Sequence, residues 1–129
     1  MKTFLTASVA GAALLFATSA FAADLGAELT TAATHAGLAA KAADINGVHM
    51  HMHHAINCLE GAKGADYDAT NANPCAKSGS GLLVDSTDAG QKAKLQTALA
   101  SANAGLAATD VPAAQKDAMD AQASIDSAK

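Results

Sequence analysis

Large apolar side chains are scarce in this sequence, and their scarcity limits the core that the chain can build. The three phenylalanines all lie within the first 21 residues, tryptophan is absent, and Tyr67 is the only aromatic residue after them. Alanine is frequent in the remainder, and each alanine side chain contributes little burial at about 25 cal/mol per Å². Helices with alanine faces can approach closely, so we expect a thin core that a covalent crosslink or a ligand would help to stabilise.

Two C-terminal segments have the spacing of amphipathic helices. Apolar residues recur every three or four positions, at Leu95, Leu99, Ala102 and Leu106 in the first segment and at Val111, Ala114, Ala118, Ala121 and Ile125 in the second. We expect Ser86 or Thr87 to cap the first helix. Thr109 and Asp110 should cap the second, with Pro112 in its first turn. The connection between the two segments is short, which predicts antiparallel packing.

The N-terminal half is also helical in pattern, from about residue 25 to 60, and two architectures are open. An apolar residue recurs every seven positions, at Leu38, Ile45, Met52 and Leu59. This spacing predicts one helix of some 35 residues, about 53 Å long at 1.5 Å per residue and too long for its partners. Asn46-Gly47 is a strong turn dipeptide, however, and a fold-back there would give two shorter helices. We therefore expect an all-α fold, a small antiparallel bundle of four helices; the alternative has three, with a long kinked first helix.

The first 22 residues have the pattern of an export signal. Lys2 precedes an apolar stretch over about residues 4–17, and Ala20-Phe21-Ala22 has the small-x-small pattern of a cleavage site. The apolar stretch is shorter than the roughly 20 residues that span a bilayer, so no membrane anchor is expected. The sequence thus predicts a signal peptide at 1–22, a single helical domain at 23–129, and a periplasmic or secreted location.

The two cysteines are interpreted in the light of that location. Exported thiols are normally oxidised, so Cys58 and Cys75 are expected to form a disulfide rather than a metal–thiolate site. Closing a loop of this size contributes roughly 3 kcal/mol in the chain-entropy model. Glycine, asparagine and proline are frequent between and just after the two cysteines, which predicts a loop over about 61–85 that the bridge pins to a helix end.

The most distinctive motif is Val-His-Met-His-Met-His-His at residues 48–54, which holds four of the five histidines and two of the four methionines. On a helix, side chains three or four positions apart are neighbours, so His49 and His53 are expected to converge on one ion with Met52 adjacent. Met50 and His54 would lie on another face, and the apolar spacing places His51 in solvent.

A fold-back near residue 46 would also bring His35 of the first helix alongside His54 and Cys58. His35 is therefore a candidate supplementary ligand.

This combination of ligand types points to copper. Neutral imidazole binds zinc, copper, nickel and iron, whereas the methionine thioether is soft and selects Cu(I) among common ions. We expect an exported protein that buffers or delivers copper, with candidate ligands His49, His53, Met52, Met50, His54 and His35. Zinc and b-type haem are alternative cofactors, and the lack of aromatic residues to line a porphyrin counts against haem. A third hypothesis is a non-metal stress or interaction protein whose histidines respond to pH.

The sequence lacks the features that other classes of partner or activity require. The formal net charge is −4 and arginine is absent, so neither a nucleic acid nor an anionic membrane surface is an expected partner. The chain has no HExxH, no CxxC and no CxxCH motif. No catalytic signature is found, and we do not expect an enzyme.

Overall fold

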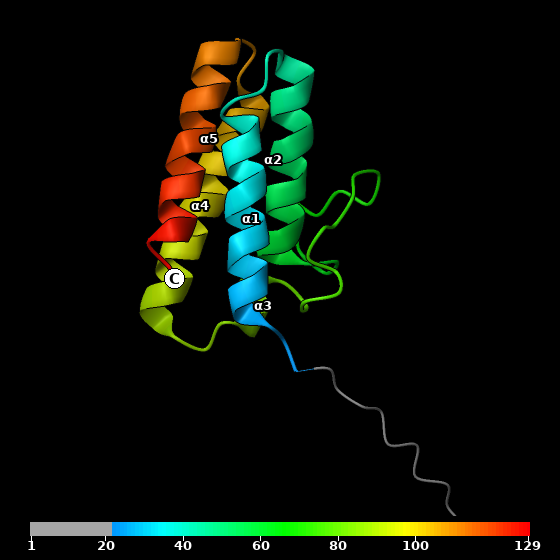
Figure 1. Ribbon diagram of the computed structural model, residues 1–129, viewed down its shortest axis with the longest axis vertical. Helices are drawn as coiled ribbons and strands as arrows, with labels where there is room; N and C mark the ends of the chain where they lie inside the picture. Colours follow the sequence, from blue (N-terminus) through cyan, green and yellow to red (C-terminus); the bar gives the residue numbers. More distant parts are fainter. Residues whose placement is uncertain (1–21) are drawn as a thin grey trace, which may run out of the picture.

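The computed structural model describes residues 22–129, which form a bundle of four long helices and one short helix with no strands (Figure 1). Helices α1 and α4 run in one direction and α2 and α5 in the other. The all-α antiparallel bundle predicted from the sequence is confirmed. Apart from Ala22, the predicted signal peptide lies outside the described residues. The helices are α1 (Leu25–Ala39), α2 (Ile45–Glu60), α3 (Leu82–Asp85), α4 (Ala89–Ala107) and α5 (Val111–Asp126).

An aspartate begins each of the four long helices. In every case its carboxylate accepts a hydrogen bond from the backbone N–H three residues later, and the four caps are Asp24, Asp44, Asp88 and Asp110. Such a cap satisfies one of the unpaired N–H groups of the first turn and contributes about 1 kcal/mol. The predicted Asp110 cap is confirmed, whereas α4 begins at Asp88 rather than at Ser86 or Thr87.

The first two helices are separate, and the chain turns at residues 40–44 rather than at Asn46-Gly47. Asp44 explains the difference, because its carboxylate accepts a hydrogen bond of 2.8 Å from the N–H of Gly47 and draws this dipeptide into the first turn of α2. The single long helix is therefore wrong. Asn46-Gly47 favours a turn, but the N-cap at Asp44, two residues earlier, places this dipeptide inside α2 instead.

About half of the buried apolar residues in the bundle core are alanines, and the larger ones are few. Met52, Ile56 and Leu59 of α2 are fully buried and pack against buried alanines of the other helices. The methyl group of Met52 would lie 2.7 Å from a Cβ atom placed at Gly105 of α4. The glycine therefore leaves room for Met52, which is a core residue. Among the described residues, no helix is both long and apolar enough to cross a bilayer.

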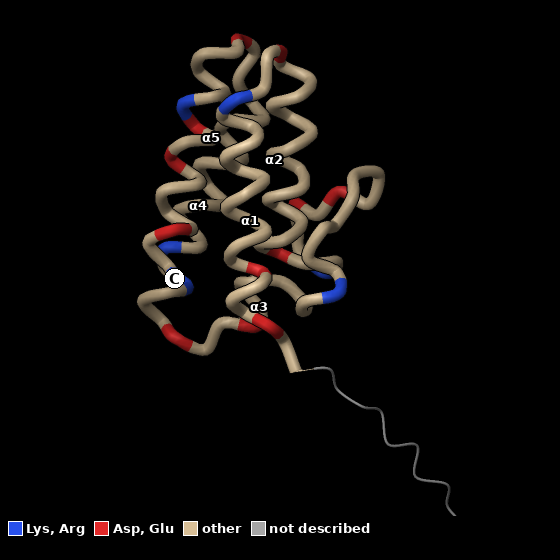
Figure 2. Tube along the Cα trace, in the orientation of Figure 1, with Lys and Arg blue, Asp and Glu red and all other residues tan. Residues whose placement is uncertain are grey.

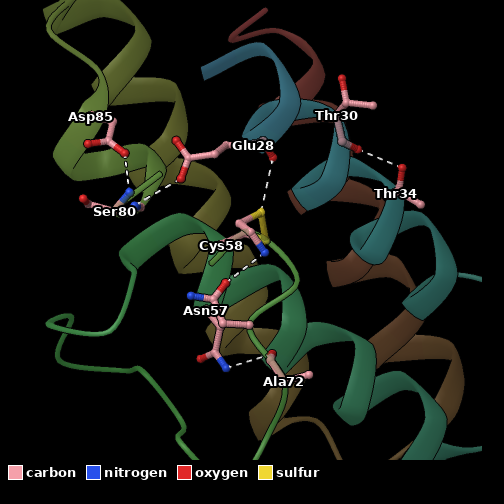
Figure 3. Close-up of a disulfide and its surroundings, with 11 residues drawn as sticks. Glu28, Thr30, Thr34, Asn57, Cys58, Ala72, Ser80 and Asp85 are labelled. Atoms are coloured by element: carbon pink, nitrogen blue, oxygen red, sulfur yellow. Dashed lines mark hydrogen bonds between the residues drawn. A yellow bond between two sulfur atoms is a disulfide. The ribbon is translucent and has the colours of Figure 1, made fainter. Parts of the chain in front are cut away.

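The predicted Cys58–Cys75 disulfide is confirmed, and it anchors an ordered loop that follows α2. The buried side chain of Asn57 donates hydrogen bonds to the carbonyl oxygens of Asp68, Asn71 and Ala72 and accepts one from the N–H of Asp68. Figure 3 shows the bond to Ala72. Part of the predicted loop at 61–85 is helical, since α3 occupies its last residues.

Candidate metal centre

Three histidines of α1 and α2 meet between these two neighbouring helices. His51 and His54 lie three positions apart on α2 and therefore point to the same side of that helix. His35 faces them from α1, which runs antiparallel to α2. The candidate ligands thus all come from a single helical hairpin.

The three imidazoles are close enough to share one ion. One ring nitrogen of each histidine can be chosen so that all three lie within 4.8 Å of one another. The Nδ1 atoms of His35 and His51 are 3.4 Å apart, and the ring centroids of His35 and His54 are 4.9 Å apart. Two imidazoles on one tetrahedral zinc ion have their nitrogens about 3.3 Å apart, given Zn–N bonds of about 2.0–2.1 Å. The group is therefore near the geometry of a three-histidine site.

The surroundings of His35 and His54 favour neutral imidazole, which is the form that binds metals. All three histidines are half-buried. Burial lowers the pKa of His35, and the neighbouring His54 and His51 lower it further, because they would repel a second positive charge. Burial likewise lowers the pKa of His54, followed by the effect of His51. Among the described residues, Nδ1 of His54 is buried with no hydrogen-bond partner, so no hydrogen bond competes with an ion for that atom.

The helix surfaces around this group have no formal charge. Glu28 is the only acidic or basic residue of α1 (excluding histidine), Glu60 is the only one of α2, and both lie near helix ends (Figure 2). Calcium and magnesium prefer oxygen ligands such as carboxylates. Nitrogen donors without a neighbouring carboxylate instead suit zinc, copper and nickel.

Met50 is the methionine best placed to add a sulfur ligand. It lies four positions before His54 on α2, so the two side chains are neighbours on the helix surface. Its side chain is 43% exposed, so it is not fixed in the core. Met52, by contrast, is fully buried in the core on a different side of α2.

The structure places His49 and His53 away from the three-histidine group. Nε2 of His49 is 3.1 Å from the carbonyl oxygen of Ala108, just after α4. Nδ1 of His53 is 3.5 Å from Oδ2 of Asp68 in the disulfide loop. Hydrogen bonds from Thr70 lower the pKa of Asp68 to about 2, so this carboxylate is ionised beside His53. His49 thus contacts the residue that follows α4, and His53 lies beside the disulfide loop.

His51 is the site residue that sequence reasoning missed. It was expected in solvent, but it is half-buried and forms part of the group. A fold-back at residues 46–47 would set His35 opposite Cys58, whereas the observed turn at 40–44 sets it closer to His51. The sequence feature that could have predicted the position of His51 is Asp44. As the N-cap it fixes the start of α2 and hence the alignment of α2 with α1.

Comparison of this chain with protein-family models, with characterised proteins and with solved structures found no match in any of the three.

Proposed function

We propose that this protein binds one copper ion between α1 and α2, with His35, His51 and His54 as ligands. The observation that carries the proposal is the convergence of three half-buried imidazoles, with one ring nitrogen of each within 4.8 Å of the others, from two helices that carry no acidic or basic residue near the group. Without a catalytic signature in the sequence, the role of such a site is to hold or transfer the ion.

Copper is favoured over zinc because of Met50. Three imidazoles alone suit either metal, but a thioether ligand selects Cu(I). Met50 neighbours His54 on the helix surface and is exposed enough to turn towards the ion. In this proposal Met50 is the fourth ligand. Met52 packs in the core, and His49 and His53 contact neighbouring segments rather than the ion.

Haem is a weaker candidate for the same residues. A b-type haem with two histidine ligands needs an imidazole on each face of a porphyrin, with apolar side chains around the ring. Here three imidazoles converge on one point, and Tyr67 is the only aromatic residue from Ala22 onwards. The group fits a single ion better than it fits a flat macrocycle.

Export to an oxidising compartment is part of the proposal. The Cys58–Cys75 disulfide is supporting evidence, because such bridges persist in the periplasm and outside the cell but rarely in the cytosol. The proposal expects a mature chain that begins at Ala23. Intact mass and N-terminal sequencing of the protein from its native host would test this cleavage position.

Two double variants test the ligand assignment, and each removes two histidines. Replacing His35 and His54 by alanine removes two of the three ligands, so Cu(I) affinity should fall at least about 100-fold. The matched control replaces His49 and His53 and should retain affinity within a few-fold. Affinity is measured under anaerobic conditions by competition with bicinchoninate, using ascorbate as the reductant so that the disulfide stays intact.

The outcomes separate the alternatives. Loss of affinity in the His49/His53 variant, with binding retained in the other, would move the site to the opposite side of α2. Unchanged affinity in both variants, or no binding by the wild-type protein, would refute the proposed function. Circular dichroism of each variant confirms that the helices remain folded.

A further inference from the structure

A second unusual group lies near the start of α1, two helical turns from His35. Glu28 is fully buried, which is uncommon for a carboxyl group. Its Oε1 atom accepts a hydrogen bond of 3.1 Å from the N–H of Gly81. Within the described part of the chain, its Oε2 atom is buried and has no hydrogen-bond partner. A buried carboxyl group in this state needs either a proton or a partner.

Asp85 of α3 approaches the same backbone segment as Glu28. Its Oδ2 atom accepts a hydrogen bond of 2.5 Å from the N–H of Ser80. Figure 3 shows both carboxyl groups directed towards Ser80. A Cβ atom placed at Gly79 would lie 2.4 Å from Oδ2 of Asp85 and 2.6 Å from Oε1 of Glu28. Two carboxyl groups from different helices therefore enclose residues 79–81.

The electrostatics of this pair favour one shared proton. Burial raises the pKa of Glu28 from 4.5 to about 7, and the neighbouring Asp85 and the more distant Asp24 raise it as well. The hydrogen bond from Gly81 acts in the opposite direction. Residues 79–81 contribute no titratable side chain, and the carboxylate of Glu60 at the end of α2 accepts a hydrogen bond from Asp66 instead.

We propose that Glu28 and Asp85 form a proton-dependent latch, which holds residues 79–85 against α1 while the two carboxyl groups share one proton and releases them when that proton is lost. In the closed state, neutral Glu28 carries the shared proton, its Oε1 atom accepts from the N–H of Gly81, and the carboxyl group of Asp85 accepts from the N–H of Ser80. When the proton passes to solvent, a buried carboxylate is left facing a second one, and separation of α3 from α1 relieves the repulsion. The released segment connects Cys75 to α4.

The sign of the pH dependence follows from the direction of the pKa change. The folded protein binds the Glu28 proton more tightly than the unfolded chain does, because the pKa is higher in the folded state. The stabilisation from the latch is therefore complete below about pH 4.5, and it is lost as the pH rises through about 7.

Hydrogen exchange of the disulfide-bonded protein tests the latch. After correction for the intrinsic exchange rate, the amides of Ser80 and Gly81 should exchange about tenfold faster for each pH unit between about 5 and 7, and this increase should level off above pH 7. In Glu28→Gln this excess should disappear, because the amide still accepts from Gly81 and donates towards Asp85 at every pH. Glu60→Gln removes the same charge from the only other glutamate and should behave as the wild type.

A second variant and a direct titration keep the test decisive if Glu28→Gln does not fold. Asp85→Asn should also abolish the excess exchange, because its amide can donate to an ionised Glu28. Carbon-13 NMR of the wild-type protein should show Glu28 titrating near pH 7. Titration of Glu28 near its ordinary value of 4.5, or equal pH dependence in wild type and a folded variant, would overturn the latch.

Discussion

Met50 is the side chain that would make the three-histidine group selective for copper. The histidines supply borderline donors that suit several divalent ions, whereas the thioether is a soft donor. Met50 is 43% exposed beside the group, and Met119 of α5 is 52% exposed on a helix that contributes none of the three imidazoles. Among the described residues, Met50 and Met119 are the exposed methionines, and only Met50 neighbours His54 along its own helix.

Replacing Met50 with leucine should lower Cu(I) affinity about tenfold or more and leave Zn²⁺ affinity nearly unchanged, since zinc gains little from a thioether. Met119→Leu is the matched control and should change neither affinity. Both are measured by chelator competition, and X-ray absorption on the copper-loaded protein should show a Cu–S contribution that Met50→Leu lacks. An unchanged copper affinity in Met50→Leu would remove the sulfur ligand from the site.

The helices could be predicted from local sequence, because amphipathic spacing and capping act within a few residues of one another. Both C-terminal helices, the helical nature of residues 49–54 and the disulfide are confirmed. The turn between α1 and α2 was placed a few residues too late, because the Asn46-Gly47 pattern carries no information about the competing cap at Asp44. That small shift decides which histidines meet. His35 and His54 were therefore among the predicted ligands, whereas His51 was not.

The side chain of Asn57 connects α2 to the disulfide loop through its hydrogen bonds. Replacing it with alanine leaves the N–H of Asp68 and three carbonyl groups without their partner, so stability should fall by about 2–3 kcal/mol. Urea unfolding of the oxidised protein measures the change. Asn103→Ala removes an exposed hydrogen bond from α4 to Asp66 in the same loop and should cost less than about 1 kcal/mol. Equal losses in the two variants would contradict this role for Asn57.

At the scale of the whole molecule, a metal ion would compensate for a core built largely from alanine. The interior of the bundle holds few large side chains, so a crosslink between α1 and α2 has a large relative effect. The disulfide fastens the far end of α2 to the loop, while the three histidines lie nearer to the α1–α2 turn. The two links therefore stabilise different parts of the bundle.

Metal binding should consequently raise the thermal stability of the protein. A free ion at a thousand times its Kd adds about 4 kcal/mol, which corresponds to a rise in Tm of at least about 10 °C for a domain of this size. Scanning calorimetry with and without the ion measures this rise, and addition of a chelator should reverse it. The His35/His54 double variant should show almost no rise, and an equal rise in that variant would place the stabilising ion elsewhere.

The three imidazoles all lie between residues 35 and 54, ahead of both cysteines and of the whole second hairpin. Under the proposed export, a chain that emerges N-terminus first would present its three candidate ligands before Cys75 has appeared. The proposed site would then be complete in the first hairpin before the disulfide and the second hairpin can form.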